Sequence, residues 1–230
     1  MFGFTLLRII HQIVNLRKHF PQKIIWIRKE DFKSAYRRVH VTAETAVRTA
    51  VRVRVNRIDM ILISLRLVFG GASCPSEFCV ISDIVTDTIN DLLLCKNWDH
   101  KKIKSKFVDI IPKAKRLDEK IEFAQAKDIT VNIPLEIHGK ADSFIDDIIT
   151  VAVDIGDNRA RIEAAPCTVL HAIAHNANNN SKVPRNDIIS DDKNEAEGEA
   201  NEIKLVLGWS LDTRRLLVKL PYHKKVAWTN

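Results

Sequence analysis

The spacing of apolar residues along the chain predicts helices in four places. Residues 5–20 carry apolar side chains at a helical period, which ends at Pro21 because proline cannot continue a helix. A longer helix is expected from about Ser76 to Cys95, since Pro75 suits a first helical turn and the following apolar positions form a wide face. This helix should lie beneath a sheet as core. Two further helices are expected, at residues 43–50 and from about Asn158 to His175.

Shorter runs of β-forming residues predict strands between these helices. Several of these runs alternate apolar with polar residues, as a strand with one buried face does. Asp31 falls near the C-terminal end of the first strand, a common position for a metal ligand. The expected strands are residues 23–28, 51–57, 59–69 and 129–137, a hairpin around 144–153, and a second hairpin at 203–221 with its turn at 211–213.

Two adjacent carboxylates, Asp146 and Asp147, interrupt the hairpin around 144–153. Aspartate is a poor strand residue, and apolar β-formers lie on both sides of the pair, Phe144-Ile145 before it and Ile148-Ile149 after it. Carboxylates in apolar surroundings usually have a cation, and hard divalent ions such as Mg²⁺ bind carboxylate oxygens. The pair therefore predicts a metal site at the hairpin tip. A solvated turn that happens to read Asp-Asp is the alternative.

The composition is that of a globular protein with an uneven charge. The 230 residues are 46% hydrophobic and 28% charged, enough for one large domain or two small ones, and no apolar run is long enough to span a membrane. The net charge is +7, with 13 Lys and Arg against 4 Asp and Glu in residues 1–60. Residues 187–202 instead hold seven acidic side chains and one lysine. The basic half suggests a polyanionic partner such as nucleic acid, and a solvated basic surface is the alternative.

The four cysteines match neither a zinc module nor a disulfide framework. This pattern predicts reduced thiols in a cytoplasmic or nuclear protein. The cysteines are Cys74, Cys79, Cys95 and Cys167.

Four motifs occur in an order that resembles the palm domain of a reverse transcriptase, the RNA-directed DNA polymerase of retrotransposons and retroviruses. Each motif alone is a weak signal, and the shared order makes the resemblance specific. The resemblance covers about residue 11 to the C-terminus and is poorly defined over 96–135. The residues of the motifs are most similar to those of retroelement polymerases. The motifs are Asp31-x-x-Ser34-Ala35-Tyr36, residues 67–70 with Pro75 and Phe78, residues 144–147, and residues 207–212 running to Leu220-Pro221.

The resemblance implies an α+β fold, a polymerase palm whose antiparallel sheet has helices packed on one face. It also implies two Mg²⁺ ions, with Mn²⁺ as a substitute, which activate the primer 3′-hydroxyl and hold the triphosphate. Asp31 and Asp146 would bridge both ions, and Asp147 would complete the catalytic cluster. Because Asp31 and Asp146 are 115 residues apart, adjacent strands of one sheet must bring them together.

The same resemblance implies roles for further residues. Tyr36 matches the position whose ring blocks a ribose 2′-hydroxyl, and a core tyrosine is the alternative. Lys204 matches a lysine proposed in the family to help protonate pyrophosphate. Phe69 stands where viral members often have glutamine, and Phe144 stands where tyrosine is usual. The implied nucleotide-binding residues are Phe32, Tyr36, Phe69, Gly70 and Lys204, and the implied primer- or template-binding residues are Phe144, Gly208 and Trp209.

The expected activity is transfer of deoxynucleoside triphosphates (dNTPs) onto a primer 3′-hydroxyl, directed by an RNA or DNA template. Fingers and thumb look incomplete, so we expect the remaining polyprotein domains, which could include a ribonuclease H, to lie outside this chain. A non-catalytic nucleic-acid-binding remnant with the palm fold is the alternative. The expected parts are an N-terminal helix and fingers remnant at 1–22, a palm at 23–206 with an insertion at about 96–135 and an acidic loop at about 176–202, and a primer-grip-like hairpin with the start of a thumb at 207–230.

Overall fold

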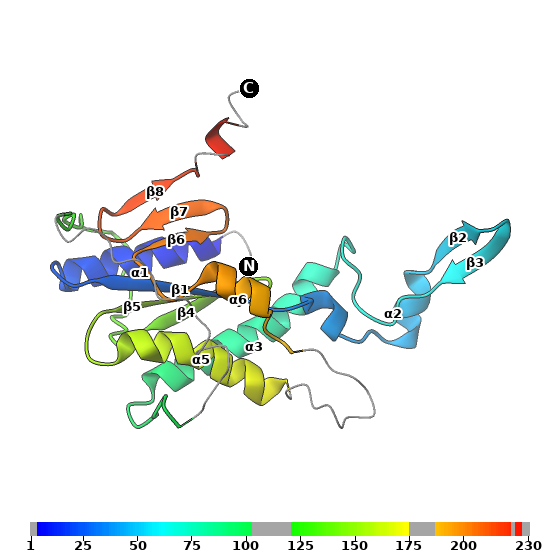
Figure 1. Ribbon diagram of the computed structural model, residues 1–230, viewed down its shortest axis with the longest axis horizontal. Helices are drawn as coiled ribbons and strands as arrows, with labels where there is room; N and C mark the ends of the chain where they lie inside the picture. The colour runs from blue at the N-terminus through cyan, green and yellow to red at the C-terminus, as the bar shows by residue number, and fades with distance from the viewer. Residues whose placement is uncertain (1–3, 103–120, 175–186, 222–223, 227–230) are drawn as a thin grey trace.

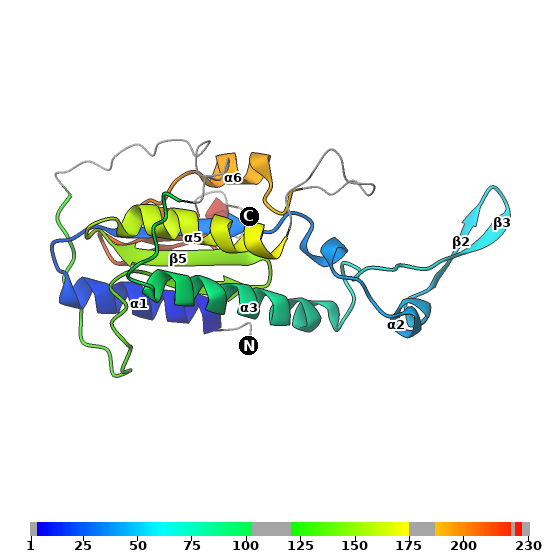
Figure 2. The same cartoon turned by 90° about the horizontal axis from the view of Figure 1, so that it is seen from below.

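The computed structural model describes residues 4–102, 121–174, 187–221 and 224–226. Helices and two small sheets form the body of the molecule, and one β-hairpin projects away from it (Figures 1 and 2). The helices are α1 (Thr5–His19), α2 (Ala43–Arg48), α3 (Cys74–Leu94), α5 (Asn158–Ile173) and α6 (Asp191–Glu197), with a 3₁₀ helix η2 (Ala35–Arg38). The strands are β1 (Ile25–Asp31), β2 (Val51–Val55), β3 (Ile58–Leu62), β4 (Lys140–Phe144), β5 (Asp147–Val153), β6 (Ile203–Val206), β7 (Trp209–Asp212) and β8 (Leu217–Lys219).

The central sheet has the strand order β1-β5-β4, and its neighbouring strands are antiparallel. The middle strand, β5, is apolar enough to be covered on both faces, and every residue from 148 to 153 is buried. The register joins Ile25 to Val153 at one end of β1 and Asp31 to Asp147 at the other. The predicted first strand and the predicted hairpin around 144–153 are confirmed, and together they form the core of the α+β fold.

Helices cover both faces of the central sheet. α3 and α5 pack on the face that carries Ile148 and Ala152, where they form the larger hydrophobic core. α1 packs on the opposite face, where its Ile13 shares a second core with Ile149 and Val151. The expectation of helices on one face only is therefore wrong. Alternate residues of β5 point to opposite faces and are apolar on both, so each face needs a cover.

The predicted helices form close to their expected bounds. α1 ends before Pro21, and α3 begins at Cys74 with Pro75 in its first turn. Phe78 and Ile89 lie on the buried side of α3 and pack into the larger core, so this helix lies beneath the sheet as predicted. α5 ends at Ile173, and residues 175–186 lie outside the described part of the chain.

β2 and β3 form the hairpin that projects from the body (Figures 1 and 2). Val53 pairs with Met60, so the valines of β2 share one face of the hairpin with apolar residues of β3. The arginines of β2 lie on the other face. β3 ends at Leu62, so the strand-like run predicted at 59–69 is only partly a strand.

The C-terminal region forms a second antiparallel sheet, β6-β7-β8, instead of a single hairpin. The chain turns at Leu207-Gly208, between β6 and β7, and again after Asp212. The turn expected at 211–213 therefore falls partly within β7. Gly208 has φ +84, a conformation that residues with a side chain rarely adopt, so the first turn favours glycine.

The segment expected as an acidic loop at about 176–202 contains the helix α6. Its acidic residues Asp191 and Asp192 are exposed, whereas Asn194 is buried against the central sheet, where its side chain accepts a hydrogen bond from Arg28. Within the described part of this segment, α6 therefore has one exposed and one buried side, and the buried side connects it to β1.

Residues 129–137 form no strand, although an alternating pattern predicted one there. Pro134 removes a backbone donor from this run, which weakens any ladder it could form. The free edge of β4, which a further strand would need, is also occupied by side chains. The Asn15 amide instead donates to the C=O of Ile133 (3.2 Å), so this irregular segment is held by α1.

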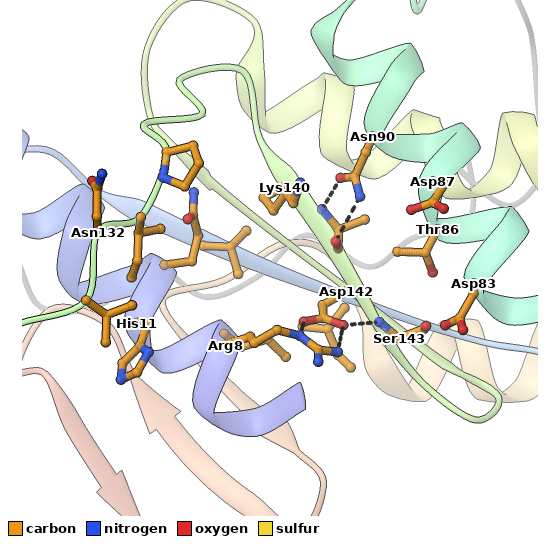
Figure 3. Close-up of a pocket in the computed structure, with 18 residues that line it drawn as sticks. Arg8, His11, Asp83, Thr86, Asp87, Asn90, Asn132, Lys140, Asp142 and Ser143 are labelled. Carbon is orange, nitrogen blue, oxygen red and sulfur yellow. Dashed lines mark hydrogen bonds and ion pairs between the residues drawn. The ribbon is translucent and has the colours of Figure 1, made fainter. Parts of the chain in front are cut away.

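Side chains close the outer edge of β4. The Asn90 side chain accepts from the N–H of Ala141 (2.7 Å) and donates to the C=O of the same residue (3.1 Å), as Figure 3 shows. Thr5 Oγ1 donates to the C=O of Ser143 (2.8 Å). Unpaired backbone groups at a sheet edge attract other strands, and these contacts satisfy them within the chain.

All four cysteines are free thiols, in agreement with the sequence. Over the part of the chain that the structure describes, no helix is long and apolar enough to cross a membrane.

We expect Asn90→Ala to lower the free energy of unfolding by about 1–3 kcal/mol, because it leaves two buried backbone groups of Ala141 without their partner. Urea denaturation followed by circular dichroism measures the change. Asp87→Ala, nearly one turn earlier on α3 at an exposed position, is the matched control and should cost less than about 0.5 kcal/mol. An equal loss in the two variants would contradict the edge-closing role of Asn90.

Candidate metal centre at the acidic end of the central sheet

Three aspartates lie together at one end of the central sheet. Asp31 is the last residue of β1, and its partner across the strand pair is Asp147, the first residue of β5. Asp146 lies in the turn just before β5, and its C=O accepts a hydrogen bond from the N–H of Phe32 (3.1 Å). The antiparallel pairing of β1 with β5 thus joins two acidic motifs that are distant in sequence.

The turn that presents Asp146 has a strained backbone. Only Ile145 and Asp146 connect β4 to β5, and Ile145 has φ +56, a left-handed conformation that a β-branched residue rarely adopts. Such a conformation costs on the order of 1–3 kcal/mol and persists only where surrounding contacts impose it. Here the pairing of Phe144 with Asp147 and the hydrogen bond from Phe32 hold the turn.

Two lysines neutralise part of the negative charge. The ammonium group of Lys193 in α6 lies 2.7 Å from Oδ1 of Asp31. The ammonium group of Lys29 lies 3.3 Å from Oδ1 of Asp147 and 2.8 Å from Oε1 of Glu197. With Asp146 included, two ammonium groups face four carboxylates, so the site keeps an excess of negative charge.

Burial and mutual repulsion raise the pKa of both hairpin aspartates. For Asp146 burial is the larger cause, and the neighbouring Asp31 carboxylate raises the pKa further. For Asp147 burial raises the pKa to about 6, although the ammonium group of Lys29 opposes the shift. A bound cation would favour the charged forms of both groups, since it supplies the compensation that water no longer provides.

The carboxylates of this site are suitable ligands for a divalent cation, but their present spacing does not form a metal site. Carboxylate oxygens are the ligands that Mg²⁺ and Mn²⁺ prefer. Within the described ranges, however, no three His, Cys, Asp or Glu side chains are grouped closely enough to hold an ion. Lysine ammonium groups contact two of the carboxylates instead. A cation that bound Oδ1 of Asp31 would therefore have to displace Lys193.

An aromatic group lies beside the carboxylates. The ring of Tyr36 contacts Phe69, with 5.9 Å between ring centroids, and meets Phe78 edge-on at 5.6 Å. Burial raises the pKa of the Tyr36 hydroxyl, and the nearby charge of Asp146 raises it further. Phe69 leaves 92% of its surface exposed. Tyr36 therefore contacts both the exposed Phe69 and the buried Phe78, near the acidic turn.

Three of the residues expected to bind nucleotide have other surroundings. Phe32 is buried in the core and packs edge-on against Phe78 at 5.4 Å. Lys204 is also buried, its ammonium group donates to the C=O of Glu197, and burial lowers its pKa to about 8. Neither side chain is open to a nucleotide in this conformation. Gly70 has φ +91, and no atom lies within 4 Å of the position that a Cβ atom would take. The conformation of the turn therefore favours glycine, whereas no neighbouring group comes close enough to require it.

The residues expected to contact primer or template lie on two separate sheets. Phe144 ends β4 directly across from Asp147, beside the acidic turn. Gly208 and Trp209 lie at the turn between β6 and β7, and Trp209 is partly exposed. The structure therefore brings one of these three residues to the carboxylates.

Sequence reasoning missed the contacts that hold α6 beside the aspartates. The buried guanidinium of Arg28 donates to Glu30 (2.6 Å) and to the side-chain oxygen of Asn194. One signal was available, because Lys193 is the single lysine in the acidic segment 187–202. No local pattern shows that this lysine faces Asp31, since the two residues meet only in the folded chain.

Comparison with known proteins found no match to a family model, a curated protein or a solved structure.

We expect Asp147→Asn to stabilise the metal-free protein at pH 7.5 by about 1–3 kcal/mol, with loss of the Lys29 contact offsetting part of the gain. Folding raises the pKa of Asp147, so the stability that depends on its protonated form is complete below the ordinary value of 3.8 and is lost as the pH rises through about 6. The variant has no charge to bury and escapes this loss. Urea unfolding in EDTA at pH 4.5 and pH 7.5 measures the difference. The prediction fails if the variant is less stable than wild type at pH 7.5.

Proposed function

We propose that this chain is the palm of an RNA-directed DNA polymerase of a retroelement. The observation that carries the proposal is the meeting of Asp31 with Asp146 and Asp147 at one end of an antiparallel sheet. Two-metal nucleotidyl transfer needs carboxylates from separate strands at one point. Tyr36 lies near Asp146, which suits a residue that tests the sugar of an incoming nucleotide.

The three aspartates and Tyr36 have different roles in this reaction. Asp31, Asp146 and Asp147 would hold the divalent ions, which lower the pKa of the primer 3′-hydroxyl and stabilise the leaving pyrophosphate when bound. The Tyr36 ring would exclude a 2′-hydroxyl by contact. Catalysis by such a site comes mainly from positioning and charge stabilisation. The strained turn at Ile145 suits this role, because it fixes the direction of the acidic pair.

Template and primer would bind mainly through their phosphates. The first 60 residues carry 13 Lys and Arg against 4 Asp and Glu, and phosphate contacts by such side chains supply most sequence-independent affinity. Arg52 and Arg54 on the projecting hairpin are exposed, and both pair with Asp59. Because these guanidinium groups are exposed to solvent, the phosphates of a nucleic acid could reach them.

A second function, a non-catalytic nucleic-acid-binding remnant of a retroelement, is favoured by one observation. The lysine contacts to Asp31 and Asp147 neutralise carboxylates that an active site needs for metal. A chain that binds nucleic acid without catalysis would keep the basic surface and have no use for the acidic triad.

Primer extension separates these two functions. We expect wild-type protein to extend oligo(dT) on poly(rA) with Mg²⁺ or Mn²⁺, and Asp146→Asn to lose at least about a hundredfold in rate, because the variant removes charge from the metal-binding cluster. Asp83→Asn, an exposed aspartate of α3, is the matched control and should retain the wild-type rate. Equal incorporation by wild type and Asp146→Asn would end the catalytic assignment. If wild type and both variants bind the template-primer but none of them extends it, the non-catalytic nucleic-acid-binding remnant is favoured.

Nucleotide selection tests the position of Tyr36. We expect Tyr36→Ala to raise the incorporation of ribonucleotides relative to deoxynucleotides by about tenfold or more, because the missing ring no longer blocks a 2′-hydroxyl. Tyr36→Phe is the control, since it keeps the ring and should keep the selectivity. Competition between rATP and dATP on a poly(dT) template measures the ratio. An unchanged ratio in Tyr36→Ala would assign Tyr36 to the core.

A further inference from the structure

The contact between Lys193 and Asp31 joins a surface helix to the acidic end of the sheet. The Lys193 ammonium group lies 2.7 Å from Oδ1 of Asp31, on the carboxylate where β1 ends. The Asp31 side chain is 13% exposed, whereas that of Lys193 is 54% exposed. The lysine can therefore leave for water at little cost, and the carboxylate cannot.

The backbone that carries Lys193 is fixed on the sheet by its neighbours. Asn194, the next residue, is buried and accepts a hydrogen bond from the guanidinium of Arg28. At the other end of α6, the carboxylate of Glu197 pairs with Lys29 and its C=O accepts from Lys204. If an ion displaced Lys193, only the lysine side chain would need to move, and it would stay tethered within reach of Asp31.

Lys29, the second lysine of the site, is more buried than Lys193 and contacts two carboxylates. Its side chain is 14% exposed, and it divides its contacts between Asp147 at 3.3 Å and Glu197 at 2.8 Å. If the Asp147 contact were lost, Glu197 would still hold the Lys29 ammonium group in place. Of the two lysines, Lys193 is the one that an incoming ion can displace.

We propose that Lys193 is a tethered internal cation, which occupies the Asp31 carboxylate in the metal-free protein and is displaced when a divalent ion binds there. This inference rests on the proposed function, since it assumes that Asp31 is a metal ligand. The ammonium group limits the repulsion among the carboxylates while no ion is bound, so the acidic end stays folded. It also weakens ion binding, because the ion must replace an existing contact and Lys193 remains nearby as a like charge.

Mn²⁺ binding to the full chain, without nucleic acid, tests the proposal. Titration followed by electron paramagnetic resonance gives the dissociation constant with no need for enzymatic activity. We expect Lys193→Met to tighten Mn²⁺ binding by about three- to tenfold, because the variant keeps the apolar stem and removes the competing charge. Lys219→Met, an exposed lysine on β8, carries the same charge change and should bind Mn²⁺ within about twofold of wild type. Lys193→Arg keeps the charge and should bind as wild type.

Thermal unfolding of the same proteins supplies a second readout. In EDTA, Lys193→Met should unfold at a lower temperature than wild type, because Asp31 has lost its counter-ion. Saturating Mn²⁺ should then raise its unfolding temperature by more than it raises that of wild type.

The outcomes separate this inference from the proposed function. If wild type binds Mn²⁺, Asp31→Asn weakens that binding and Lys193→Met leaves it unchanged, the role of Lys193 is overturned and the metal centre stands. If wild type binds no Mn²⁺, or Asp31→Asn leaves the binding unchanged, the metal centre is overturned together with the inference. The proposal is supported if Lys193→Met binds Mn²⁺ more tightly than wild type does and Lys219→Met binds it as wild type does.

Discussion

The pairing of Asp31 with Asp147 across two antiparallel strands is the constraint on which the rest of the site depends. It places like charges side by side at a partly buried end of the sheet, where the loss of water raises the pKa of Asp146 and Asp147. Like charges in such a place need a cation. Lys29 and Lys193 supply two ammonium groups from the chain itself, the first from β1 and the second from α6.

The buried side of α6 explains how a short, acidic segment reaches that position. A helix of this length has little stability alone and depends on its tertiary contacts. Arg28 provides them, since its guanidinium lies within the protein and binds both Glu30 and Asn194. Removal of Glu30 would leave the buried charge of Arg28 uncompensated, which is costly. The structure of the acidic site and the placement of α6 are therefore coupled through Arg28, together with the contacts of Lys29 and Lys204 to Glu197.

Away from its acidic end, the central sheet is covered on both faces and along the edge of β4. Helices cover both faces, and the side chains of Asn90 and Thr5 satisfy the backbone groups at the edge of β4. The projecting hairpin β2-β3 differs, because most of its residues are exposed and its basic face is open. Taken with the proposed polymerase activity, the molecule has a rigid support for the aspartates and an accessible basic extension suited to nucleic-acid phosphates.

The sequence by itself determined helices α1, α2, α3 and α5, the hairpin with its acidic tip and the position of Asp31 at a strand end, because each depends on a local pattern of apolar and polar residues. Tertiary structure alone decided which residues meet. The run at 129–137 has a strand pattern but no free edge to pair with, and Lys204 and Phe32 are buried by packing that no local pattern reports. Lys193 faces Asp31, 162 residues away in sequence, because contacts from Arg28, Lys29 and Lys204 hold α6 in place. Local propensity acts along the chain, whereas charge compensation acts through space, so only the folded chain shows how the aspartates are neutralised.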